Sequence, residues 1–216
     1  MNDATILLAD MTNRARAAAR TLATLPTATK AAALRAAAQA LRDAAPQILS
    51  ANATDMAKAT EAGLSNAMLD RLKLDSGRVA AMADGVAAVA GLADPVGAII
   101  DESERPNGLR LRRVRVPIGV IGIIYESRPN VTADAAALAV MAGNAVILRG
   151  GSEAIESNRA IHAALVSGLV AEGIPADAAQ LVPTTDRAAV GAMLAADGSA
   201  GAGAIDLIVP RGGKGL

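Results

Sequence analysis

The sequence contains no cysteine, tryptophan or phenylalanine, and it has one tyrosine and one histidine. Without cysteine there is neither a disulfide framework nor a thiolate metal site, and a single histidine excludes a histidine-rich one. We therefore predict no metal centre. A core without large aromatic side chains must be built from Ala, Leu, Ile, Val and Met, and we expect the lone Tyr125 to lie in it.

An excess of charge of either sign is also absent, because 21 basic residues balance 21 acidic ones. This balance argues against a nucleic-acid partner, which requires a basic face, and against an anionic membrane surface. Although 52% of the residues are hydrophobic, charges interrupt every apolar run before the roughly 18 residues that a membrane span needs. Asp3 and Asp10 also break up any secretory leader. We predict no membrane segment.

Residues 1–93 are rich in Ala, Leu and Arg, which have good helix propensity. Pro26, Pro46 and Gly63 punctuate this region, and proline and glycine mark helix starts and ends. We therefore predict an amino-terminal helical layer of structural character. The first expected helix ends near residue 25. Four more are expected, at residues 31–44, 46–62, 68–72 and 78–92.

Residues 94–116 predict a β-hairpin, with strands at 96–100 and 109–116 around an Arg-Pro-Asn-Gly turn. The alternation of apolar residues slips between Arg112 and Arg113, as a β-bulge would cause. Two interpretations remain open for its arginines. They either protect a solvated edge by charge, or the hairpin is an arm that pairs with another subunit.

Residues 116–152 are typical of a βαβ unit. An apolar run at 116–125 predicts a strand buried on both faces. A polar turn at 126–130 leads into a helix over 131–142, and a second buried strand follows at 145–148. In open α/β sheets, ligands bind at the carboxyl ends of such strands. The turns at both strand ends are therefore the candidate site.

The same alternation continues to the end of the sequence. A helix beginning at residue 153 or 157 and ending at 172 precedes a strand at 179–182, another helix and a strand at 205–209. The predicted fold is α/β, with a parallel, Rossmann-like sheet and helices on both faces. Because no helix follows the last strand, we expect a truncated chain whose core, residues 117–216, is incomplete at its carboxyl end.

Arg149 suggests which cofactor this core would bind. The sequence lacks a GxGxxG fingerprint and a Walker A motif. At the end of the second strand of a dinucleotide-binding unit, an acidic residue contacts the ribose 2′-hydroxyl, whereas an arginine accommodates a 2′-phosphate. Arg149 therefore favours NADP(H), assisted by the amides of Gly150, Gly151 and Ser152. The alternative is a surface arginine at a strand end.

The polar turn offers further candidates. The Asn130 amide can stabilise a developing oxyanion or cap the following helix. Glu126 and Arg128 either contact cofactor or substrate or form an ion pair within the turn, and Ser127 lies between them. His162, in the middle of a helix, is expected to be structural.

Several motifs along the chain match one family. They resemble the amino-terminal half of the γ-glutamyl phosphate reductases, a family within the aldehyde dehydrogenase superfamily, and GVIGIIYESRPNVT is the most specific of them. The matching stretches, in chain order, are DRL at 70–72, LADPVG at 92–97, RPNGL at 105–109, GVIGIIYESRPNVT at 119–132, ILRGGSEA at 147–154, TTDR at 184–187 and PRGGKGL at 210–216.

The resemblance implies a cytoplasmic, NADPH-dependent enzyme of proline biosynthesis. Such enzymes convert L-glutamyl 5-phosphate into L-glutamate 5-semialdehyde and phosphate through a cysteine thioester. It implies that Arg149 contacts the adenosine ribose or its phosphate, that Gly212 and Gly213 lie near the pyrophosphate, and that Asn130 serves an oxyanion hole. Glu126 and Arg211 are further candidates for cofactor binding. Ser127 and Arg128 become candidate substrate contacts, and the hairpin of residues 94–116 becomes the arm of a homo-oligomer.

The sequence departs from this family in lacking the nucleophilic cysteine, which in the family lies beyond the position of Leu216. Two other hypotheses stay open: a stand-alone nucleotide-binding module and a non-catalytic helical interaction protein. Saturable binding of NADPH would argue against the hypothesis of a non-catalytic helical interaction protein.

We predict that the 216-residue chain alone has no reductase activity, because no residue in it can form the thioester. The measurement is NADPH consumption by the purified chain supplied with glutamyl phosphate. Turnover above background would contradict the prediction.

Overall fold

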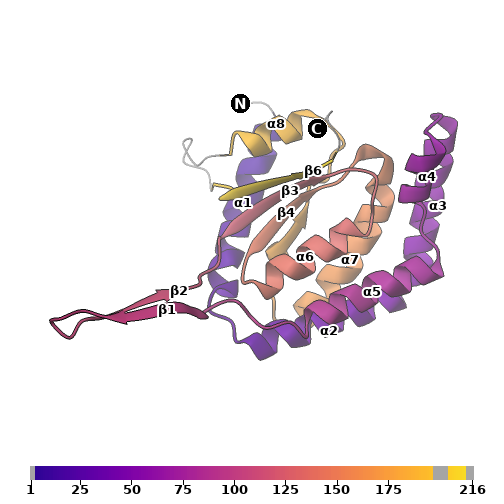
Figure 1. The fold of residues 1–216 in the computed structure, drawn as a ribbon. Helices are drawn as coiled ribbons and strands as arrows, with labels where there is room; N and C mark the ends of the chain where they lie inside the picture. The colour runs from indigo at the N-terminus through magenta and orange to yellow at the C-terminus, as the bar shows by residue number, and fades with distance from the viewer. Residues whose placement is uncertain (1–2, 197–203, 213–216) are drawn as a thin grey trace.

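The computed structural model describes residues 3–196 and 204–212. Its centre is a four-stranded, fully parallel sheet with helices on both faces (Figure 1), which confirms the predicted fold class. In spatial order the strands are β5 (Ala179–Leu181), β4 (Ala145–Arg149), β3 (Val120–Tyr125) and β6 (Leu207–Arg211).

Two groups of helices cover the sheet. The helices before the sheet are α1 (Asp3–Leu22), α2 (Thr27–Asp43), α3 (Ala45–Glu61), α4 (Asn66–Leu72) and α5 (Ser76–Val89). Those within the sheet region are α6 (Val131–Met141), α7 (Ile155–Ala171) and α8 (Ala188–Leu194), with short 3₁₀ turns η1 (Ser152–Ala154) and η2 (Ala176–Ala178). Within the described ranges, no helix has the length and apolar character that a membrane crossing requires.

The five amino-terminal helices do not form the single layer that the sequence predicts. α1 packs against β3, β4 and α8 on one face of the sheet, whereas α2, α3 and α5 pack outside α6 and α7 on the other (Figure 1). The reason is that β4 is buried along its whole length, so both faces of the sheet need an apolar cover. α1 supplies one with Leu8, Met11, Ala15 and Leu22.

The hairpin predicted for residues 94–116 forms and extends away from the body of the molecule (Figure 1). Its strands, β1 (Ile99–Glu104) and β2 (Arg110–Val114), are antiparallel and exposed along their whole length. The irregularity lies in β1, between Ile99 and Asp101, and not between Arg112 and Arg113 as predicted. The extra residue is therefore on the strand whose pattern gave no signal.

Two glycines near the start of β3 allow other atoms to pack closely against the backbone. A Cβ on Gly122, inside β3, would lie 2.5 Å from Ile208 Cδ1. A Cβ on Gly119, just before β3, would lie 2.2 Å from Asp206 Oδ2, and the positive φ of 124° also favours glycine there. β3 therefore begins only at Val120, whose amide donates to Asp206 over 2.7 Å.

Helices α2 and α7 approach each other closely, because the residues that face each other between them are glycine and alanine. A Cβ on Gly168 in α7 would lie 2.4 Å from the Cα of Ala37 in α2, and Ala33 and Ala37 are fully buried. Backbone atoms cannot give way as a flexible side chain can, so this contact depends on glycine.

We predict that Gly168→Ala destabilises the fold by about 1–3 kcal/mol, because overpacking forces the backbones apart. The matched control is Gly85→Ala in the middle of α5, where an added Cβ would lie at an ordinary 3.7 Å from Asp134. There the better helix propensity of alanine should increase stability by up to about 1 kcal/mol. Urea unfolding followed by circular dichroism measures both variants, and equal effects would contradict the prediction.

Candidate functional site

The carboxyl ends of β3 and β4 lie side by side, because Ile124 pairs with Arg149 in the parallel register. The loops that follow open onto one cavity of ≈ 590 Å³, and α8 lines the cavity as well. Five of the predicted site residues line this cavity: Glu126, Ser127, Arg149, Gly151 and Ser152. The structure thus brings the two candidate turns to a common space.

Arg149 joins the loops at this edge of the sheet. Its Nη1 donates to the carbonyl oxygen of Gly150 (2.7 Å), and its Nη2 donates to that of Thr185 (2.9 Å). The residue is only 8% exposed, and among the described residues its buried Nε has no hydrogen-bond partner. Because a guanidinium carries five N–H donors, the two Nη groups retain hydrogens for a ligand. Among the described residues, no carboxylate forms an ion pair with Arg149.

Gly150 and Gly151 are required by close packing. A Cβ on Gly150 would lie 2.1 Å from Nδ2 of Asn158, and one on Gly151 would lie 2.3 Å from Oε1 of Glu153. Gly150 faces inward, towards Tyr125, and does not line the cavity. Any contact that it makes with a cofactor must therefore come from its backbone.

Tyr125 lies in the core, as expected, and shares a hydrogen bond of 2.7 Å with the Thr132 hydroxyl. Thr132 in turn is 3.0 Å from Oδ1 of Asn158. Burial raises the pKa of Tyr125 to about 12, although the Thr132 hydrogen bond and the Arg149 charge oppose the shift. The phenol therefore stays neutral, and it supports the loop after β4, where Gly150 faces it.

Ser127 is buried and contacts the neighbouring loop. Its backbone amide and its hydroxyl both donate to Oε1 of Glu153, over 2.8 and 2.6 Å. Glu153 therefore ties the loop after β3 to the start of α7. The hydroxyl hydrogen of Ser127 is committed to this bond, so only its oxygen remains as an acceptor for a ligand. Glu153 itself was not predicted from the sequence.

Arg128 and Asn130 lie away from the first cavity. A second cavity of ≈ 420 Å³ is lined by Arg128, Arg211 and Gly212 together with Glu126, Ser127 and Arg71. A third, of ≈ 370 Å³, is lined by Asn130 and again by Arg71 and Arg128. Gly213, the remaining predicted residue, lies outside the described residues.

The Asn130 side chain makes no helix-capping hydrogen bond, so the capping alternative does not hold. Its Nδ2 donates instead to Oδ2 of Asp134 over 2.8 Å. Burial raises the pKa of the Asp134 carboxyl, while the Asn130 bond and the Arg211 charge oppose this shift. The structural role expected for His162 agrees with the geometry, since its Nε2 is 2.9 Å from the Ala179 carbonyl oxygen and burial lowers its pKa.

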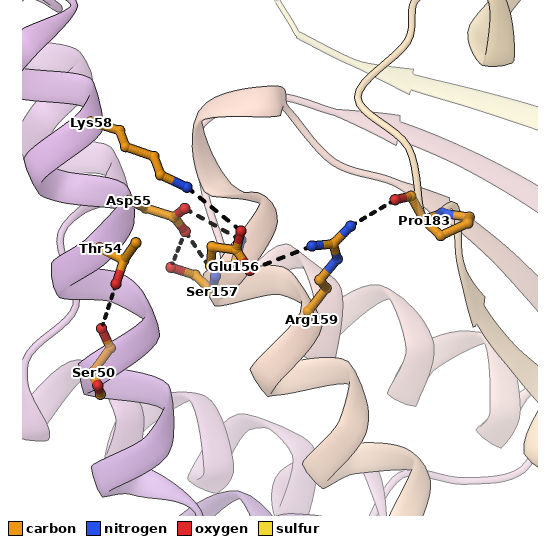
Figure 2. A network of polar contacts seen from close by, with 8 residues as sticks. All are labelled: Ser50, Thr54, Asp55, Lys58, Glu156, Ser157, Arg159 and Pro183. Carbon is orange, nitrogen blue, oxygen red and sulfur yellow. Dashed lines mark hydrogen bonds and ion pairs between the residues drawn. The ribbon is translucent and has the colours of Figure 1, made fainter.

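A buried polar network holds the loop after β4 in place (Figure 2). Asp55 of α3, only 1% exposed, accepts hydrogen bonds from the Ser157 amide (2.8 Å), the Ser157 hydroxyl (2.6 Å) and the Glu156 amide (3.3 Å). These amides belong to the first turn of α7, where no intrahelical acceptor exists. Asp55 therefore caps α7 from another helix.

Asn52, one turn before Asp55, extends this network. Its Nδ2 donates to the Leu72 carbonyl (2.8 Å) and to the Ser157 hydroxyl (3.1 Å), and its Oδ1 accepts from the Leu74 amide (2.8 Å). One buried amide thus fixes the end of α4 relative to α7. Neither residue could be identified from the sequence, because a polar side chain in an Ala-rich helix is usually solvent-exposed.

Comparison with known proteins agrees with this architecture. A model of the aldehyde dehydrogenase family matches residues 7–202. The chain belongs to the aldehyde dehydrogenase family, a family of oxidoreductases.

Within that family, the chain is similar to γ-glutamyl phosphate reductases. It is 68% identical over 214 residues to the one from Sphingopyxis alaskensis, covering 99% of this chain and 49% of the relative. The crystal structure of the Thermotoga maritima reductase superposes with a TM-score of 0.91 at 41% identity, covering 97% of this chain and 49% of that one. The crystal structure of the Saccharomyces cerevisiae reductase superposes with a TM-score of 0.85 at 34% identity, covering 96% of this chain and 51% of that one. The chain spans about half the length of these relatives.

We predict that Asp55→Ala destabilises the protein by about 1–3 kcal/mol, because it leaves buried donors of α7 without an acceptor. Hydrogen exchange at the amides of residues 156 and 157 should accelerate. Thr54→Ala, one residue away on the exposed side of α3 (Figure 2), is the control and should change stability by no more than about 0.5 kcal/mol. A loss confined to the control, or the same loss in both variants under urea unfolding, would refute the capping role.

Proposed function

We propose that this chain forms the cofactor-binding part of an NADPH-dependent γ-glutamyl phosphate reductase of proline biosynthesis, acting in the cytoplasm. The observation that carries the proposal is the common cavity at the ends of β3 and β4, with Arg149 in its wall. The 68% identity with a γ-glutamyl phosphate reductase along nearly the whole chain supports the same reading.

The residues in the first cavity fit a phosphorylated nicotinamide cofactor. Arg149 offers a buried cation with an unpartnered Nε and further Nη hydrogens, which suits a ribose 2′-phosphate. Gly151 and Ser152 line the wall at the start of η1, where backbone amides can meet phosphate oxygens. The Glu153 carboxylate is less repulsive to such a group because it accepts two hydrogen bonds from Ser127.

The remaining roles are assigned as follows. Glu126 lies where the first and second cavities meet and contacts the cofactor there. Arg211 and Gly212, at the end of β6, bind near its pyrophosphate, and Gly213 is assigned to the same group from the sequence alone. The Asn130 amide has a second hydrogen besides the one given to Asp134, which supports an oxyanion role. Ser127 and Arg128 face the substrate.

The domain organisation in this proposal has three parts. Residues 1–93 are the helical cover, residues 94–116 the oligomerisation arm and residues 117–216 the Rossmann-like core. Both strands of the arm are exposed along their whole length and carry the apolar residues Ile99, Leu111 and Val114, which supports a homo-oligomer formed through it.

The composition limits which steps of the reaction the residues of this chain can carry out. When bound, NADPH supplies the hydride, and the thioester requires a cysteine that these 216 residues do not contain. The residues of this chain bind and orient the two reactants and exclude water between them.

We predict that the chain binds NADPH at least about tenfold more tightly than NADH, because only NADPH carries the 2′-phosphate assigned to Arg149. Arg149→Gln should weaken NADPH binding by about tenfold and leave NADH binding within about twofold. Titration followed by the intrinsic fluorescence of the reduced cofactors measures both, and the absence of tryptophan keeps the protein background low.

The control for this titration is Arg159→Gln. Arg159 also donates to a loop carbonyl, that of Pro183 (2.8 Å), but it lies outside the cavity, so its replacement should leave the cofactor preference unchanged. Failure to bind either cofactor, or a preference for NADPH that survives Arg149→Gln, would overturn the assignment.

A further inference from the structure

Three arginines surround the second cavity, and the proposed cofactor site uses at most one of them. Arg71 comes from α4, Arg128 from the loop after β3 and Arg211 from the end of β6. Segments far apart in the sequence thus place three guanidinium groups around ≈ 420 Å³. Glu126 is the acidic residue of this lining, so the wall has an excess of positive charge.

Two of these arginines have no internal counter-ion. Within residues 3–196 and 204–212, neither Arg71 nor Arg128 has a side-chain hydrogen bond or an ion pair, whereas Arg14, Arg42 and Arg78 each pair with an aspartate. The acidic neighbour of Arg71 in sequence, Asp70, is already bound by Arg78 at 2.9 Å. Arg211 interacts electrostatically with Asp134.

Such an arrangement is typical of an anion site. Like charges gathered at one place repel one another, and the repulsion is relieved when a dianion occupies the space between them. Guanidinium groups suit phosphate in particular, because their planar pairs of N–H donors match two phosphate oxygens. The third cavity shares Arg71 and Arg128 with the second, and its other charged lining residues are Lys73, Arg78, Asp70 and Asp134, so basic residues outnumber acidic ones there too.

The position of Arg71 is fixed by the buried network. Asn52 binds the carbonyl of Leu72 and the amide of Leu74, and Leu72 is fully buried. The backbone next to Arg71 is therefore held against α3 and α7 before any ligand binds. The held backbone limits the conformational entropy that the exposed Arg71 side chain must lose when it binds an anion.

We propose that Arg71 and Arg128 bind the phosphate group of an acyl-phosphate substrate. The inference rests on the proposed function and names the residues that recognise its substrate. The first and second cavities meet at Tyr125, Glu126 and Ser127. A phosphate in the second cavity therefore holds the acyl group of the substrate beside a cofactor in the first, where the thioester that forms as phosphate leaves can accept the hydride.

The test uses inorganic phosphate as the probe and the complete 216-residue chain. Isothermal titration calorimetry at low ionic strength measures phosphate binding with and without saturating NADPH, and circular dichroism verifies that each variant is folded. Arg71→Ala and Arg128→Ala should each weaken phosphate binding by about tenfold or more and leave the dissociation constant of NADPH within about twofold. Arg71→Lys should restore part of the affinity, because it keeps the charge but not the paired donors.

The matched control is Arg35→Ala. Arg35 is exposed on α2 and lines none of the three cavities, so its removal lowers the net charge equally without touching the site. Phosphate affinity should stay unchanged in this variant.

The outcomes separate this inference from the proposed function. NADPH binding without phosphate binding, or phosphate binding that is insensitive to Arg71 and Arg128, overturns the inference alone. Displacement of phosphate by NADPH also overturns it, because the arginines would then bind the cofactor's own phosphates. If neither ligand binds to the folded chain, the proposed function fails and the inference fails with it.

Discussion

Parallel pairing of β3 with both β4 and β6 determines where every candidate residue lies. In this register Ile124 is opposite Arg149 on one side and Pro210 on the other. Three strands therefore end at the same level, and their polar turns share one edge of the sheet. A shift of one residue would turn the buried side chains of β3 and β4 towards the opposite face and separate the turns. The cavities exist because this register is kept.

The helices reinforce that register from outside. Asp55 caps α7 directly after the loop that follows β4, and Asn52 ties α4 to the same point. Arg149 then joins this loop to the one after β5. The first and second cavities are therefore bounded by segments that are linked through buried polar atoms, which are costly to leave without partners. Such a frame suits a site that must hold two ligands at a fixed separation.

The sequence predicts those features of the protein that depend on local pattern. The apolar runs ending at Tyr125 and Leu148 could be assigned to buried strands, because polar residues lie directly beyond their ends and a parallel sheet buries both faces of such a strand. The same reasoning predicted that the turns after these two strands lie at one edge of the sheet, which the register confirms. It could not place α1 on the opposite face from α2, since both helices carry similar Ala-rich stripes. It also could not find Asp55 or Arg71, whose roles depend on partners from distant segments.

The central claim is that the turns after β3, β4 and β5 form one site for a phosphorylated nicotinamide cofactor. Hydrogen exchange with and without saturating NADPH, read by mass spectrometry across the chain, tests it most directly. The account predicts that protection concentrates at residues 125–130, 149–154 and 184–188, and that the hairpin of residues 94–116 is unchanged. Protection confined to the hairpin or to the outer helices, with none at these turns, would contradict it.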